Sequence, residues 1–285
     1  MIYLEYIDNV DNRDNFNTNN HEKHPNDVEA MNKDYKKEIF KTHLSNYMDL
    51  INYPVEWTYT FTQNETKLLS DICKIGIQVL RRPKIFSDEI EQIVDRVNKN
   101  WVNGEWFVRS DSASPKDSMI KFPYRNPTEL IDGIITSRRF YLGVLDNIQF
   151  GKETVLYFVK YGTNWNIERE LRCFVRNKKL TAISQYDWFR YGFFCHLSEP
   201  ELKRIAENVD LLVCDIVDKI TEKIETDDFV VDLYVNDDGS LKIVELNSFG
   251  YWLASGSALF HWITDKDKLY NDLGNIYFRI LKKNT

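Results

Sequence analysis

The chain has 285 residues, of which 43% are hydrophobic, and 37 basic against 44 acidic residues give a formal net charge of −7. This length suits one large globular domain or two small ones. The net negative charge does not favour nucleic acid binding by the protein as a whole, although it leaves room for a local basic groove. The four scattered cysteines form no CxxC pair, which argues against a zinc site or disulfide framework and favours a reducing, cytoplasmic location. No apolar run of about eighteen residues and no signal-peptide pattern is present, so membrane spanning and secretion are not expected.

The first hundred residues predict a polar segment followed by helices. Residues 8–28 are almost wholly Asn, Asp and charged side chains, which bury too little apolar surface to offset the entropy of ordering, so this segment is predicted to be mobile. Helical spacing of apolar residues predicts a helix over 28–53 that Pro54 ends. A second helical region is expected over 66–100, and its later part begins with Ser87 as N-cap.

The remainder of the chain mixes strands with helices. A short strand at 106–109 leads into a polar loop of small residues, which can let backbone amides approach a ligand. The other expected elements are a helix opened by Asn126-Pro127, a strand at 154–161, a hairpin at 170–187, a helix from 198 to about 225, a hairpin at 229–250 and a last helix at 265–281. The middle and the C-terminal part of the chain are predicted to contain hairpins rather than alternating βαβ units, so the predicted fold class is α+β.

The hairpin FVVDLYVNDDGSLKIVELNSFG, residues 229–250, allows its cross-strand pairs to be predicted. Two alternating apolar runs flank residues 236–239, and Gly239 can adopt the positive φ that a tight turn needs. With these four residues as the loop, Val235 would face Ser240, and Asp232 would face Ile243.

That pairing places three polar side chains together. Residues opposite each other, and residues two apart on one strand, share a face of the sheet, so Asp232, Glu245 and Asn247 would project from one side. For each residue alone a solvated face is the simpler interpretation, but the apolar neighbours favour a covered one. Two carboxylates and an amide oxygen are hard ligands that suit Mg²⁺, which usually also takes substrate phosphates. The hairpin therefore predicts a magnesium site with a phosphate partner nearby.

Basic residues in strand-like surroundings are candidates to bind that phosphate: Arg109, Lys116, Lys160 and Arg172. A buried cation needs an anionic partner. The alternative is an internal salt bridge with Glu170, Asp187 or the hairpin carboxylates. Neither GxGxxG nor GxxxxGK[ST] occurs, and His196 and His261 are expected to be packed or capping residues rather than general bases.

Three stretches together resemble the cell division cycle protein 123 family: VRSDSASPKDS (108–118), FVKY with ERELRCFVRNKKLTAISQYD (158–161 and 168–187), and DDFVVDLYVNDDGSLKIVELNSFG (227–250). That family has an ATP-grasp fold, in which two α+β lobes clamp ATP. The resemblance spans about residues 85–265. It implies a divergent segment at 1–84, partly mobile and then helical, and an ATP-grasp-like core at 85–285 with lobes at 85–160 and 161–285.

The resemblance implies ATP and Mg²⁺ as cofactors and gives roles to particular positions. Arg109 stands where the family has a Lys that reaches the phosphates, and Arg172 stands at a phosphate-side Arg. The adjoining nucleotide loop would contain Ser112, Ser114, Lys116 and Asp117. The hinge whose backbone meets the adenine edge would be Val159, Lys160 and Tyr161, and the metal ligands would be Asp232, Glu245 and Asn247.

Several positions depart from the family pattern. Arg replaces Lys at 109, so a planar guanidinium with several N–H donors stands in place of a compact ammonium group. Glu245 stands for an Asp, Ser112 for a Trp and Tyr186 for a basic residue, and the stretch after Gly250 is longer than usual.

Two functions follow as hypotheses. Eukaryotic family members are assembly chaperones for eukaryotic translation initiation factor 2 that bind its γ subunit, so the resemblance implies the same partner here. The alternative is an ATP-grasp ligase that activates a carboxylate or a phosphate end, with RNA as a conceivable substrate. That alternative is motivated by the changed loop, the divergent N-terminal segment and the basic residues Arg81, Arg82, Lys84, Arg138 and Arg139.

Overall fold

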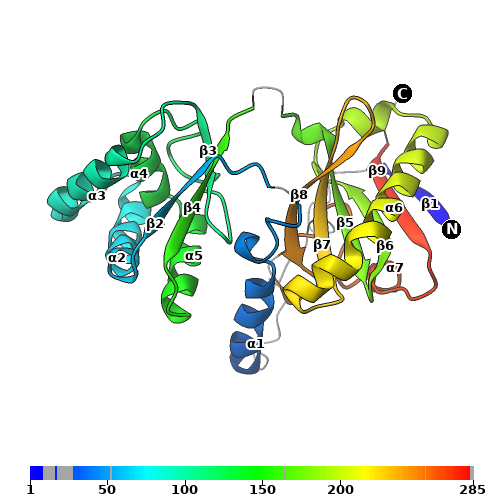
Figure 1. The fold of residues 1–285 in the computed structure, drawn as a ribbon. Coiled ribbons are helices and arrows are strands. Elements are labelled where there is room, and N and C mark those ends of the chain that lie inside the picture. Colours follow the sequence, from blue (N-terminus) through cyan, green and yellow to red (C-terminus); the bar gives the residue numbers. More distant parts are fainter. Residues whose placement is uncertain (9–16, 18–27, 52, 163–164, 254, 283–285) are drawn as a thin grey trace. The chain divides into compact units, whose positions relative to one another are not determined.

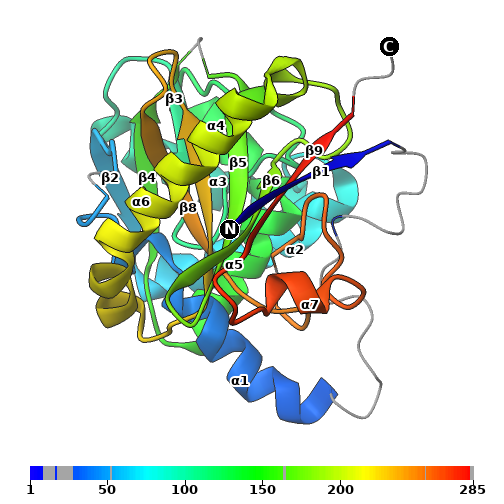
Figure 2. The same ribbon diagram turned by 90° about the vertical axis from the view of Figure 1, so that its right-hand side faces the viewer.

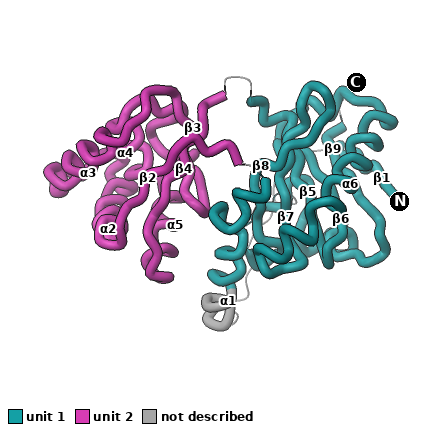
Figure 3. The backbone as a smooth tube through the Cα atoms, viewed as in Figure 1, with its two compact units in different colours: residues 1–52, 165–285 teal, residues 53–164 magenta. Residues whose placement is uncertain are grey.

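The structure is a computed structural model that describes residues 1–8, 17, 28–51, 53–162, 165–253 and 255–282 (Figure 1). The segment predicted to be mobile lies almost wholly outside these residues. The chain divides into two compact units, of which unit 1 comprises Met1–Asn52 and Trp165–Thr285 and unit 2 comprises Tyr53–Asn164 (Figure 3). The expected N-terminal segment 1–84 is thus divided, because residues 53–84 are part of unit 2.

Unit 2 is a small antiparallel sheet with helices. The sheet has the order β2 (Trp57–Phe61), β4 (Thr154–Lys160), β3 (Trp106–Arg109). The helices are α2 (Gln63–Val79), α3 (Ser87–Lys99), α4 (Pro127–Ile135) and α5 (Arg138–Gln149). Apolar residues from the sheet and all four helices form one buried core.

The helical region predicted over 66–100 is in fact two helices. Leu80 ends α2 in the left-handed conformation (φ 54°), and Pro83 precedes a 3₁₀ turn, Lys84–Phe86, that leads into α3. Ser87 is the first residue of α3 rather than its N-cap, because its hydroxyl donates backwards to the Lys84 carbonyl at 2.8 Å. The start of α4 is as predicted, since the Asn126 side chain accepts from the Glu129 N–H at 2.9 Å.

Unit 1 is built on a sheet that has six strands among the described residues. Its order is β1 (Ile2–Ile7), β9 (Ile276–Leu281), β6 (Lys179–Gln185), β5 (Glu170–Arg176), β7 (Phe229–Val235), β8 (Leu241–Ser248). The pairs β1–β9 and β6–β9 are parallel, and Figure 2 shows β1 lying along β9. The other elements are α1 (Val28–Lys41), α6 (Glu199–Ile224), the short α7 (Lys266–Leu269) and the 3₁₀ turns Leu44–Asn46, Ile167–Arg169 and Phe193–His196.

Two helix predictions in unit 1 are wrong in extent or type. The helix predicted over 28–53 ends at Lys41, where the Asn46 side-chain amide donates to the carbonyls of Phe40 (2.8 Å) and Lys41 (3.0 Å) that would otherwise continue it. The segment predicted as helix over 265–281 holds one short helix and then strand β9. Gly274 adopts φ +70° between them, and a short apolar run such as IYFRIL does not by itself separate strand from helix.

The hairpin of β7 and β8 has the predicted face but a different register. The loop is one residue longer than predicted, because Val235 pairs with Leu241 rather than with Ser240. A bulge at Val244 then adds a second shift, so that Asp232 pairs with Glu245 instead of Ile243. Because side chains alternate between the two faces of a strand, two one-residue shifts return each side chain to its predicted face. Asp232, Glu245 and Asn247 therefore lie on one face, as predicted.

None of the helices in the described ranges combines the length and the apolar character needed to cross a membrane.

Candidate functional site

A row of polar residues crosses the whole six-stranded sheet of unit 1. Each member is paired in register with its neighbour on the next strand, so all point to the same face. From β1 to β8 the row is Glu5, Arg279, Ser184, Arg172, Asp232 and Glu245. The row places the predicted Arg172, Asp232 and Glu245 on three adjacent strands, although they are far apart in sequence.

Asp232 and Arg172 form the centre of this row. Asp232 is completely buried and Arg172 is 7% exposed. Arg172 donates from Nε to Oδ1 of Asp232 at 2.9 Å and from Nη2 to Oδ2 at 2.7 Å, a two-pronged contact that matches guanidinium to carboxylate. Burial by itself would lower the pKa of Arg172, but the carboxylate of Asp232, with further contributions from Tyr186 and Glu245, raises that pKa above its ordinary value. The pair therefore stays ionised, and the internal salt bridge considered for Arg172 is present.

Glu245 and Asn247 complete the predicted cluster. The Nδ2 of Asn247 donates to Oδ2 of Asp232 at 3.0 Å, and half-buried Glu245 is close enough to Arg172 to favour its charged form. Carboxylate oxygens accept several contacts at once, so the bond to Arg172 is compatible with metal coordination. Two carboxylates and an amide oxygen are a donor set that fits Mg²⁺. Across the described residues there is no group of three or more His, Cys, Asp and Glu side chains arranged to hold a metal, so a site here needs the amide and outside ligands.

The segment that follows β8 is held against this row by buried and partly buried hydrogen bonds. Arg172 Nη1 donates to the carbonyl of Gly256 at 2.7 Å, and the N–H of Leu259 donates to Ser184 Oγ at 3.0 Å. Arg279 Nη1 donates to the carbonyl of Leu259 at 3.1 Å, and the guanidinium binds both oxygens of Asp265 at 2.6 and 2.7 Å. The segment after Gly250 is therefore held in place next to the cluster through Gly256 and Leu259.

Sequence reasoning missed an aromatic pair on the same face. Trp165 packs on Tyr234 with a centroid separation of 4.4 Å, and Tyr234 lies two residues from Asp232 on β7. The Trp165 indole N–H donates to buried Glu170 at 2.6 Å, yet 45% of the Trp165 side chain is exposed. An exposed ring held in a fixed orientation is suited to stacking against a flat ligand. Nothing around Trp165 in sequence signals this, because the contact depends on the pairing of β5 with β7.

Tyr186, where the resemblance implies a basic residue, belongs to the same cluster. The guanidinium of Arg172 lies 4.9 Å from the centre of the Tyr186 ring. Burial is the main cause that raises the pKa of the Tyr186 phenol, so the phenol is neutral at pH 7. The substitution removes a positive charge from the face and adds a ring that packs on Arg172.

The remaining predicted site residues lie in unit 2. Arg109 is 5% exposed at the end of β3, and its guanidinium lies 5.9 Å from the Tyr53 ring centre. Ser114 is buried in the following loop, where Lys116 is exposed. Ser112 lies directly against α5, because a Cβ added to Gly143 would fall 2.3 Å from the Ser112 hydroxyl.

Asp117 has a structural role that the sequence did not indicate. Its carboxylate accepts from the Ser137 hydroxyl and, at 3.1 Å, from the Arg139 N–H at the start of α5. The carboxylate therefore ties the loop to a helix N-terminus.

The predicted hinge lies where β4 loses one of its partners. The ladder with β2 ends at the Trp57–Phe158 pair, whereas the ladder with β3 reaches Lys160. The N–H of Tyr161 donates to the Glu105 carbonyl at 2.8 Å and so faces β3. Because successive residues of a strand face opposite neighbours, Lys160 presents its backbone on the β2 side, beyond the last pair. Among Val159, Lys160 and Tyr161, Lys160 is thus the residue whose backbone lies beyond the last β2–β4 pair.

The structure brings the predicted residues together as two sets, one in each unit. Unit 1 carries Arg172 and the three hairpin residues, and unit 2 carries Arg109, the residues of the predicted loop and those of the predicted hinge. Of the basic residues that motivate the ligase hypothesis, Arg82 binds Asp132 within unit 2 and so contributes to its structure. His261 is a capping residue as predicted, since its Nδ1 accepts from the N–H groups of Ile263 and Thr264 at 3.1 Å.

Comparisons with known proteins agree with this architecture. Residues 149–285 match the sequence pattern of the family described as D123. A translation initiation factor eIF2 assembly protein from Xenopus laevis is 32% identical over 93 residues, which cover 33% of this chain and 25% of that protein. A CDC123-like protein of Acanthamoeba polyphaga mimivirus is 27% identical over 245 residues, which cover 82% of this chain and 66% of that protein.

The fold is similar to that of one solved structure. C-terminally truncated Cdc123 from Schizosaccharomyces pombe superposes with a TM-score of 0.59 at 16% identity, over 87% of this chain and 98% of that one. The likeness confirms the predicted α+β fold class. The sequence matches, at 149–285 and to the CDC123-like protein, confirm the resemblance of this chain to the cell division cycle protein 123 family.

Proposed function

We propose that this protein binds ATP with Mg²⁺ and that the face of unit 1 bearing Asp232 is the metal and phosphate side of the site. One observation carries the proposal: a buried Arg172–Asp232 pair is flanked by a second carboxylate, Glu245, and by the amide of Asn247. The carboxylates of the cluster can bind a cation, and its guanidinium can bind an anion. Magnesium triphosphate carries both kinds of charge.

The chain's own residues have separate tasks in this proposal. Asp232, Glu245 and Asn247 offer oxygens to the metal, Asp232 also holds Arg172 in place, and Arg172 offers a donor to phosphate oxygens. Bound Mg²⁺ would offset the negative charge of the phosphates. Trp165, stacked on Tyr234, offers an exposed ring for the base.

Calorimetric titration of ATP with and without Mg²⁺ tests the site. Glu245→Gln removes a charge from a half-buried position, so it is expected to weaken Mg²⁺-dependent ATP binding at least about tenfold, or 1.4 kcal/mol, without unfolding the protein. Asp237→Asn is the matched control, because Asp237 lies at the tip of the same hairpin with its side chain 95% exposed. An unchanged affinity in Glu245→Gln would contradict the assignment.

We further propose that the protein assists the assembly of translation initiation factor 2, with the γ subunit as its partner. The support is the resemblance to the family, one curated member of which is named an eIF2 assembly protein. A pull-down of the γ subunit with the full chain is expected to recover a complex. Failure of binding, where an authentic family member binds under the same conditions, would contradict the proposal. Analysis of the bound nucleotide for ADP or AMP separates binding alone from the ligase alternative.

A further inference from the structure

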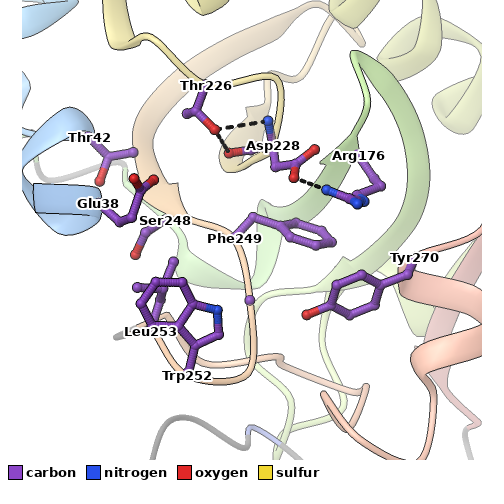
Figure 4. Close-up of a pocket in the computed structure, with 11 residues that line it drawn as sticks. Glu38, Thr42, Arg176, Thr226, Asp228, Ser248, Phe249, Trp252, Leu253 and Tyr270 are labelled. Atoms are coloured by element: carbon purple, nitrogen blue, oxygen red, sulfur yellow. Dashed lines mark hydrogen bonds and ion pairs between the residues drawn. The ribbon is translucent and has the colours of Figure 1, made fainter. Parts of the chain in front are cut away.

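The two edge strands of the sheet in unit 1 differ in how they are covered. At β8, the N–H of Leu246 donates to the hydroxyl of Tyr47 at 2.9 Å, so the chain that follows α1 covers part of this edge. Figure 4 shows Glu38 and Thr42 beside Ser248 at the end of β8, where they line a cavity of about 180 Å³. The ladder between β7 and β8 also contains a bulge. Covering segments and bulges are means by which proteins keep a sheet edge from pairing with another chain.

Strand β1, at the opposite edge, lacks these protections in the part of the chain that the structure describes. There it pairs with β9 alone, and the ladder is continuous from Ile2 to Ile7 (Figure 1). Its sequence, IYLEYI, contains neither Pro nor Lys. Its one charged residue, Glu5, is neutralised by Lys268 at 2.6 Å and by Arg279 at 2.7 Å. A short apolar edge of this kind is able to pair with a further strand.

The pairing with β9 decides which backbone groups of β1 point outward. The carbonyl of Ile7 accepts from the N–H of Lys282 at 2.9 Å and so faces β9. Both backbone groups of a residue in a strand point to the same side, and successive residues point to opposite sides. The N–H and C=O groups of Ile2, Leu4 and Tyr6 therefore point away from β9, toward the edge.

A groove of about 680 Å³ lies beside this edge, on the face of the sheet that α6 covers. Its lining residues include Ile2, Ile276, Lys203, Glu207, Asp210 and Leu211. Ile2 and Ile276 are paired neighbours on β1 and β9, and Leu211 on α6 is 65% exposed. Apolar side chains next to three charged ones suit a tyrosine, whose ring is apolar and whose hydroxyl needs a polar partner.

The outward backbone groups of β1 are complementary to those of a second, antiparallel copy of β1. With a two-fold axis at Leu4, Leu4 faces Leu4 and Ile2 faces Tyr6, so three outward pairs exchange two hydrogen bonds each. An axis at Tyr3 or Glu5 leaves only two such pairs, and an axis at Glu5 also sets two carboxylates opposite each other. The axis at Leu4 thus satisfies every outward group.

The same pairing fills the groove. Opposed residues share a face of the sheet, so Tyr6 of one copy lies opposite Ile2 of the other, on the side of the groove. Tyr6 is 39% exposed in the single chain. Each copy therefore supplies both a ring and the groove that receives it, which is the self-complementarity that a two-fold interface requires.

We propose that this protein forms a two-fold dimer by antiparallel pairing of its β1 strands, with the Tyr6 ring of each copy in the groove of the other. One continuous sheet then runs through both copies. The interface is separate from the cluster around Asp232 and does not depend on nucleotide binding.

Sedimentation equilibrium of the full chain tests the dimer. The mass is expected to rise from that of one chain to that of two as the protein concentration increases from about 1 μM to about 100 μM. A chain that stays monomeric at about 100 μM overturns the proposal, and the edge is then available only to a strand of a different protein.

Amide hydrogen exchange of the full chain identifies the surface that is used. The N–H groups of Leu4 and Tyr6 are expected to exchange at least about tenfold more slowly in the dimer than in the monomer, because they become hydrogen-bonded. Those of Tyr3 and Glu5, which face β9, are expected to be protected in both states. A dimer in which Leu4 and Tyr6 exchange as fast as in the monomer overturns the proposal, because association then uses another surface.

Two variants and a control test the contact between ring and groove. Tyr6→Thr keeps a residue that suits a strand but removes the ring, and it is expected to weaken dimerisation at least about tenfold. Tyr251→Thr is the matched control, because Tyr251 follows β8 and is 42% exposed. Leu211→Ser removes an exposed apolar side chain from the groove without altering β1, and it is also expected to weaken dimerisation. An unchanged dissociation constant in either Tyr6→Thr or Leu211→Ser overturns the proposal.

Discussion

At the scale of single residues, Asp232 shows why a site prediction and a stability prediction differ. The sequence predicts that it is a metal ligand, and the structure adds that it is a fully buried carboxylate that neutralises Arg172. Removing one partner of a buried ion pair leaves an uncompensated charge, which costs more than the pair itself contributes.

Asp232→Ala is therefore expected to lower the free energy of unfolding by about 3–5 kcal/mol. Replacing both partners, as in Arg172→Met with Asp232→Leu, is expected to recover much of the loss, because neither buried charge remains. Urea denaturation of the single and double variants measures both effects. A single variant as stable as wild type would show that the pair is not buried in solution.

Glu5 predicts how stability depends on pH. Burial alone would raise the pKa of Glu5, but hydrogen bonds from Lys268 and Arg279 outweigh it and lower the pKa below its ordinary value of 4.5. The ionised form is thus favoured by folding. Its contribution is complete above about pH 4.5 and is lost as the pH falls through the lower, folded pKa.

Glu5→Gln is accordingly expected to be less stable than wild type at pH 7, and the difference is expected to shrink as the pH falls below 4.5. Denaturation midpoints between pH 7 and pH 3 check this. A difference that stays constant with pH would show that the charge of Glu5 is not what stabilises the strand.

At the scale of elements, local signals predicted starts better than ends. Asn126-Pro127-Thr128-Glu129 and Ser198 with Glu201 begin α4 and α6 as predicted, because a cap and its partner are three residues apart. The predicted end of α1 was wrong because the true end depends on Asn46, which lies outside the helical pattern. The prediction of a helix where β9 lies was wrong because the partners of β9 are far away in the sequence.

Ser198→Ala gives a prediction for one such start. The Ser198 hydroxyl and N–H both contact Glu201 Oε2, at 2.6 and 2.8 Å. Loss of the cap is expected to cost about 1 kcal/mol of unfolding free energy. Ser198→Thr, which keeps the hydroxyl donor to Glu201, is expected to stay near wild type in the same denaturation assay. Equal losses in both variants would argue against the capping role.

At the scale of the whole molecule, the two units differ in how the chain builds them. Unit 2 is one continuous stretch with its own sheet and core, whereas unit 1 needs β1 from the start of the chain and β9 from its end. A continuous unit with a closed core is able to fold by itself.

A fragment of residues 53–164 is therefore expected to unfold cooperatively and to show mixed α and β circular dichroism. Removal of residues 1–8 from the full chain is expected to destabilise unit 1 alone, because β9 then loses one of its two partners. A full chain without these residues should show two unfolding transitions, of which one matches the fragment. A fragment without a cooperative transition would contradict the independence of unit 2.

The sequence by itself determined the α+β class, the resemblance to the cell division cycle protein 123 family and the shared face of Asp232, Glu245 and Asn247. These depend on local alternation, on turn residues and on motifs that are contiguous in the chain. Even the face was reached through the wrong pairs, since a longer loop and the bulge at Val244 offset each other.

Only the tertiary structure decided which strands are neighbours. That order brings Arg172 to Asp232 and places Trp165 on Tyr234. It also makes residues 276–281 a strand rather than the predicted helix, and it joins the segment after Gly250 to Arg279. Each of these contacts joins segments whose separation in sequence carries no periodic signal, because the pairing is selected by the burial of the whole sheet rather than by any one strand.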